Sequence, residues 1–90
     1  MERTTVIFRE FDGETVAFFP ELPGSGRYDC MSYMHIGQHG AATHEVYEQT
    51  SATLEYDDLL DELENIGYVL AVRRRWTRAM DVRRYATCDV

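Results

Sequence analysis

The side chains best suited to chemistry gather in one segment, Cys30 to Glu45, which reads CMSYMHIGQHGAATHE. It holds all three histidines of the chain, one of its two cysteines and two of its six glycines. Imidazoles and thiolates are ligands that Zn²⁺ prefers, so His35, His39 and His44 form a candidate metal set. Cys30 and His35 are an odd number of positions apart and point to opposite faces of a continuous strand. The spacing matches no zinc signature, and we expect no metal and no cofactor.

His39 is the best candidate for acid–base chemistry in this segment. Gly37 and Gly40 flank it, and we expect them to bracket a turn in which backbone N–H groups can approach an anion. Catalysis also needs a nucleophile or a second acid, and no motif links one to His39. The side chains available for that role are Cys30, Ser32, Tyr33 and Glu45. We therefore favour binding over catalysis. The candidate binding residues are Tyr33, His35, Gln38, His39, Gly40 and His44.

Length and composition predict one folded domain. The chain has 90 residues, of which 44% are hydrophobic and 12% aromatic, as in globular proteins. Two cysteines do not make a disulfide framework, and MERTTVIFRE lacks the pattern of a secretion signal. No run approaches the roughly 20 apolar residues that cross a bilayer. We therefore expect a cytoplasmic protein with reduced thiols that binds no membrane.

Charge is divided unevenly along the chain, whose net charge is −7. Residues 1–72 hold 14 acids and three arginines, whereas residues 73–90 hold two acids and six arginines. The acidic body disfavours general nucleic-acid binding, because it repels the phosphates that a basic tail would contact. A protein is therefore the expected partner.

The first half of the chain predicts three strands. Residues 4–11 and 14–22 are rich in β-branched and aromatic residues and flank Asp12-Gly13, a strong signal for a two-residue hairpin loop. Residues 28–36 alternate as a third strand, followed by the turn that holds Gln38 and His39. We expect two apolar faces on the hairpin. One is assigned Val6, Phe8, Val16 and Phe18, and the other Ile7, Phe11, Ala17 and Phe19.

The second half predicts helices and one more strand. Residues 41–50 are compatible with a short helix. A longer one carries an apolar stripe of Tyr56, Leu59, Leu60, Leu63 and Ile66, with Gly67 in the position that commonly ends a helix. Residues 68–76 read as a strand, and residues 77–90 as a basic tail that permits either a helix or extended pairing. The fold class is therefore α+β, with a small, largely antiparallel sheet and a single domain over residues 1–76.

The predicted helices suffice to cover only one face of this sheet. The other face, which is also apolar, would then need a partner. A domain this short is also only marginally stable by itself. We therefore expect a homodimer.

Two resemblances bear on function. The segment Gly13 to Gly24, GETVAFFPELPG, resembles the start of HicB-type antitoxin domains, which implies a βββαβ order and a surface that neutralises a toxin. Residues 77–90 are too few for the DNA-binding region that such antitoxins often carry. The segment CMSYMHIGQHGAA, with Glu55-Tyr56, Leu59-Leu60 and Gly67-Tyr68, resembles short, uncharacterised bacterial and mobile-element proteins, a resemblance that implies no activity.

Three functional hypotheses follow. The first is a small acidic protein-interaction module, carried by a phage or plasmid, that binds and modulates a host protein. The second is a hydrolase or metal-binding domain centred on His35, His39 and His44. The third is a HicB-like antitoxin without a DNA-binding region.

Overall fold

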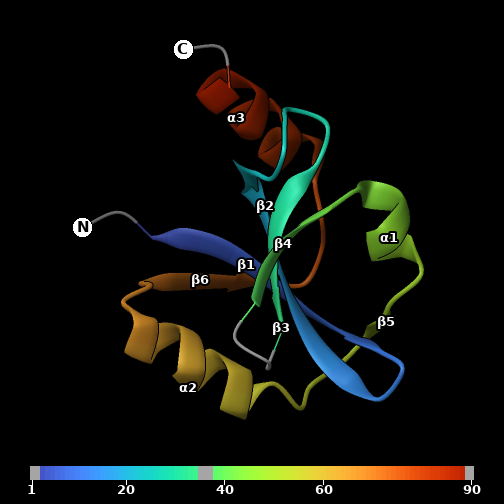
Figure 1. Ribbon diagram of the computed structural model, residues 1–90, viewed down its shortest axis with the longest axis vertical. Helices are drawn as coiled ribbons and strands as arrows, with labels where there is room; N and C mark the ends of the chain where they lie inside the picture. Colours follow the sequence, from blue (N-terminus) through green and yellow to red (C-terminus); the bar gives the residue numbers. More distant parts are fainter. Residues whose placement is uncertain (1–2, 35–37, 89–90) are drawn as a thin grey trace.

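The computed structural model describes residues 3–34 and 38–88, which form an α+β fold and confirm the predicted class (Figure 1). The strands are β1 (Thr4–Phe11), β2 (Glu14–Pro23), β3 (Cys30–Met34), β4 (Gln38–Ala42), β5 (Ser51–Ala52) and β6 (Leu70–Arg73). The helices are α1 (His44–Glu48), α2 (Asp57–Ile66) and α3 (Arg78–Cys88). All six strands join one sheet in the order β4-β3-β2-β1-β5, and β6 also pairs with β1. No helix of the described residues is long and apolar enough to cross a membrane.

The first hairpin follows the sequence prediction. Asp12 and Gly13 have φ angles of 54° and 83°, the positive values that a tight hairpin loop requires. This loop sets Phe11 opposite Glu14 and Phe8 opposite Ala17. Phe8 therefore shares a face with Ala17, and the face assignment made for β2 from the sequence is wrong by one position.

The segment after β3 differs from the prediction. Gln38, His39 and Gly40 do not form a turn, but lie in strand β4, which pairs antiparallel with β3. The predicted helix over residues 41–50 is confined to α1, which begins after Thr43, whose hydroxyl accepts a hydrogen bond from the Val46 N–H. The cause is tertiary packing, because Ala42 is buried in a core cluster with residues of β2 and β3. Residues 35–37 lie outside the described part.

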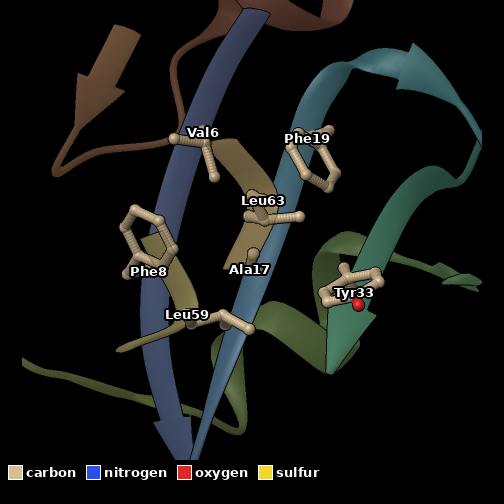
Figure 2. Close-up of a cluster of buried hydrophobic side chains, with 7 residues drawn as sticks. All are labelled: Val6, Phe8, Ala17, Phe19, Tyr33, Leu59 and Leu63. Atoms are coloured by element: carbon tan, nitrogen blue, oxygen red, sulfur yellow. The ribbon is translucent and has the colours of Figure 1, made fainter. Parts of the chain in front are cut away.

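One face of the sheet packs against α2. The cluster between them contains Val6, Phe8, Ala17, Phe19 and Tyr33 from the strands and Leu59 and Leu63 from the helix (Figure 2). Tyr56 and Leu60 pack at its margin, whereas Ile66 is half exposed. Gly67 ends the helix with a φ of 125°. The predicted helix is therefore confirmed, with an apolar stripe that stops one turn earlier.

The second face is covered as well. A cluster of Val16, Phe18, Cys30 and Ala42 packs against Tyr47 of α1 and against Trp76. Helix α3 lies beside β2. The expectation that this chain has enough helix for only one face is therefore wrong. The homodimer stays a prediction, and an uncovered sheet face no longer supports it.

The last strand and helix complete the fold. Strand β6 spans Leu70–Arg73, shorter than the predicted 68–76, and runs parallel to β1 with Thr4 opposite Leu70. Every other described strand pair is antiparallel. Residues 78–88, which the sequence left open, form α3.

Candidate functional site

The structure brings two of the predicted binding residues together and separates a third from them. Tyr33 of β3 lies opposite His39 of β4, and their rings make an edge contact with centroids 4.7 Å apart. Gln38 and Gly40 flank His39 in the same strand. His44 begins α1 and contacts Trp76 and Glu48. His35 lies outside the described residues.

The histidines do not form a metal site in the described part of the chain. His39 shares the α2 face of the sheet with Tyr33, whereas His44 contacts Tyr47 and Trp76, which cover the opposite face. One ion cannot contact two side chains separated by the sheet. Residues 3–34 and 38–88 hold no group of three or more side chains arranged to bind a metal.

Cys30 is also separated from His39. Its side chain is fully buried in the cluster on the second face. Burial raises the pKa of the Cys30 thiol to about 12, so the thiol is protonated at neutral pH. A protonated, buried thiol is neither a nucleophile nor a metal ligand.

A polar cluster surrounds Tyr33 and His39 on the α2 face. We define the tyrosine–histidine cluster as Tyr33, His39, Glu62 and Tyr68. The Nε2 atom of His39 lies 3.0 Å from the hydroxyl of Tyr68, and the Tyr68 ring stacks on Phe19. The Tyr33 hydroxyl forms a hydrogen bond with the Glu62 carboxylate, and this bond raises the pKa of Tyr33.

The chemistry open to this cluster is limited by access. Tyr33 is only 3% exposed, and Glu62 and Tyr68 are half-buried, so His39 is the one exposed member. The cluster contains no serine or cysteine that this imidazole could activate. It is better suited to hold β4 in place and to present His39 than to catalyse a reaction.

The sequence interpretation missed Glu62 and Tyr68. Glu62 lies three positions after Leu59 and beside Leu63. Helical spacing places it at the edge of the apolar stripe, and this signal was available in the sequence. Tyr68 carries no comparable local signal, because only the sheet brings it beside His39.

The two edges of the sheet have different characters. Strand β4 forms one edge, and no other described strand pairs with its outer side. Its sequence, QHGAA, contains neither a charged residue nor a proline, and Gly40 and Ala41 are exposed. At the opposite edge, β5 is two residues long and β6 is four residues long, and three consecutive arginines begin at the last position of β6. Short, charged edges resist pairing with other chains, whereas a neutral edge of small residues permits it.

A scan against protein-family models and searches of curated proteins and of solved structures gave no match.

Proposed function

We propose that this chain is a small, acidic protein-interaction module that binds an extended segment of a partner protein along the outer edge of β4. The observation that carries this proposal is the uncharged, proline-free β4 at the sheet edge. An added strand gains main-chain hydrogen bonds from such an edge. Gly40 has no side chain and Ala41 has only a methyl group, so both leave that backbone open to the partner.

Two features of the site support a particular chemistry for the partner segment. His39 is exposed beside the edge, and since its Nε2 atom contacts the Tyr68 hydroxyl, its Nδ1 atom is the one that can make a polar contact with a partner. Residues 1–72 carry a formal charge of −11, so a neutral or basic segment approaches more favourably than an acidic one. We infer that the partner is a host protein in the cytoplasm and that its segment is extended, basic and free of proline.

The proposal is tested by selecting short peptides from a display library on the folded protein and mapping them by amide NMR shifts. We expect the selected peptides to shift resonances of β4 and its neighbour β3. In Gly40→Lys, a charge blocks strand addition at the edge and repels a basic segment. We expect this variant to weaken binding by about tenfold or more.

Gly26→Lys is the matched control, because it makes the same change at an exposed glycine outside the sheet. A Cβ at Gly26 meets no atom within 4 Å, and one at Gly40 meets only the Ser32 hydroxyl oxygen at 3.5 Å. Both variants should therefore fold. Equal losses of affinity in the two variants, or peptide-induced shifts confined to other elements, would overturn the proposal.

A second candidate function has one observation in its favour. The elements β1, β2, β3, α2 and β6 follow one another in βββαβ order, with β4, α1 and β5 added. This order is the one that the HicB-type resemblance implies. A HicB-like antitoxin would use the same acidic body to bind a basic toxin. Co-expression with a small basic protein encoded beside this gene tests it, since an antitoxin must restore growth.

A further inference from the structure

A hollow in the surface lies between the end of β6, the start of α3 and the end of β2. Its volume is about 530 Å³, and its lining includes Arg73, Arg74, Arg75, Arg83, Thr5 and Thr77. We name it the arginine hollow. A neighbouring hollow shares Thr5, Glu21 and Arg83 with it and is also lined by Arg3.

The end of β6 explains why these arginines gather. In a continuous strand Arg74 would point away from Arg73 and Arg75, as the sequence alone suggests. Strand β6 ends at Arg73, however, and Arg74 and Arg75 lie in a bend. The alternation stops there, and all three residues line the same hollow, while Arg73 and Arg74 also line a second hollow beside Arg9.

One acid lines the arginine hollow, and it is already engaged. Glu21 pairs with Arg83 at 2.8 Å and accepts a hydrogen bond from the Thr5 hydroxyl at 2.8 Å. Within residues 3–34 and 38–88, no carboxylate forms an ion pair with Arg73, Arg74 or Arg75. Three positively charged residues without an ionic partner among the described residues therefore follow one another in a protein whose net charge is −7, and Arg73 donates one hydrogen bond, to the carbonyl oxygen of Val72 at 3.1 Å. Their mutual repulsion favours an anion from solution.

We infer that the arginine hollow binds an anion that carries two or more phosphoryl groups. A guanidinium can donate two parallel hydrogen bonds to one phosphoryl group, so three arginines can hold a diphosphate. Thr77, Ala79 and Met80, which also line the hollow, lie at the start of α3. There the positive end of the helix dipole adds to the attraction.

The same features argue against two other kinds of anion. No aromatic ring lines the hollow, so it offers no surface on which a nucleobase could stack. A nucleic acid would also extend over the acidic body. An acidic protein segment presents single carboxylates spaced along an extended chain, whereas these three consecutive arginines line one hollow. This inference concerns a different surface from β4 and does not depend on the proposed function.

The test is a calorimetric titration of the whole chain with pyrophosphate at low ionic strength. We expect Arg74→Gln with Arg75→Gln to weaken pyrophosphate binding by about tenfold or more, because each substitution removes a charge-assisted contact. Arg78→Gln and Arg3→Gln, combined, form the matched control, since they remove the same total charge without touching Arg74 or Arg75. We expect this pair to weaken binding by less than about threefold.

Two further probes identify the source of the phosphoryl groups. Vesicles of phosphatidylcholine with and without a phosphoinositide bisphosphate are sedimented with the protein, and binding only to the phosphoinositide vesicles would assign a lipid headgroup. Pyrophosphate binding without vesicle binding would assign a free phosphate compound. Both results support the inference.

An absence of heat with pyrophosphate, or equal losses of pyrophosphate affinity in the two double variants, would overturn it. Binding of an oligoglutamate in place of pyrophosphate would overturn it in favour of an acidic protein.

Discussion

The guanidinium of Arg84 donates a hydrogen bond of 2.7 Å to the carbonyl oxygen of Pro20 and so ties α3 to β2. The same side chain donates to the carbonyl oxygen of Arg27 and forms an ion pair with Asp81 at 2.8 Å. Asp81 in turn accepts a hydrogen bond from the Trp76 indole. Arg84 is only 3% exposed, so these polar groups depend on one another rather than on water.

The first prediction follows from that dependence. Arg84→Met should lower the free energy of unfolding by about 3–5 kcal/mol, because it leaves a partly buried carboxylate without its counter-charge and two carbonyl groups without this donor. Arg83→Met is the control, since the Arg83 side chain is 70% exposed, and it should cost less than about 1 kcal/mol. Urea denaturation of both variants checks the difference, and similar losses would show that Arg84 does not anchor α3.

The second prediction concerns the apolar stripe of α2. Leu63 is fully buried, Leu60 is half-buried and Asp58 is exposed. Leu63→Ala should lower the free energy of unfolding by about 2–5 kcal/mol, because truncation leaves a cavity beneath the sheet. Leu60→Ala should cost less, and Asp58→Ala should cost least. Chemical denaturation measures this order, and a larger loss at Leu60 than at Leu63 would refute the orientation of the helix.

The third prediction contrasts two glycines. Gly40 lies in β4 without a positive φ, and a Cβ there makes only an ordinary contact. Gly40→Val should therefore change stability by less than about 1 kcal/mol, since valine is favoured in strands. A Cβ at Gly24 would lie 2.8 Å from the Cys30 carbonyl oxygen. Gly24→Val should cost about 1–3 kcal/mol or more through overpacking. Thermal melts of the two variants test this contrast. A larger fall in the melting temperature for Gly40→Val than for Gly24→Val would contradict it.

The fourth prediction is a pH dependence that arises from Cys30. Its thiol has a pKa of about 12 in the folded protein against 9.0 as the ordinary value. Between these values the folded state keeps a proton that the unfolded state releases, so unfolding becomes easier as pH rises. The stability contributed by this proton is complete below pH 9 and is lost as pH approaches 12.

Denaturant melts of the parent protein and of Cys30→Ala, each in a Cys88→Ser background, measure this effect. The parent should lose more of its unfolding free energy than Cys30→Ala does between pH 9 and pH 12. If the unfolding free energies of the two proteins fell in parallel with pH, the folded protein would not hold the Cys30 thiol in its protonated form.

The parts of the fold that the sequence predicted well are those encoded by local signals. A tight hairpin loop requires positive φ angles, which Asp12 and Gly13 adopt. Gly67 ends a helix whose leucines recur at helical spacing. The same hairpin loop also dictates that Phe8 faces Ala17. The face assignment of β2 was therefore recoverable from the sequence and was missed.

The candidate site was less predictable, because tertiary contacts define it. Gly40 and Ala41 have a low intrinsic preference for strands, and pairing with β3 decides their conformation. Tyr68 and His39 are distant in sequence and meet only across the folded sheet. That three consecutive arginines line one hollow depends on where β6 ends, and the end of β6 is set by its pairing with β1 rather than by local composition.

The parallel pairing of β1 with β6 has a consequence for synthesis of the protein. During translation, β1 leaves the ribosome long before β6. One edge of β1 therefore stays unpaired until β6 is made, along an apolar segment that consists of Val6, Ile7 and Phe8. The acidic α2 is made in the interval, which keeps the nascent chain charged while that edge is open. A chain terminated before Leu70 would retain an unprotected strand and aggregate.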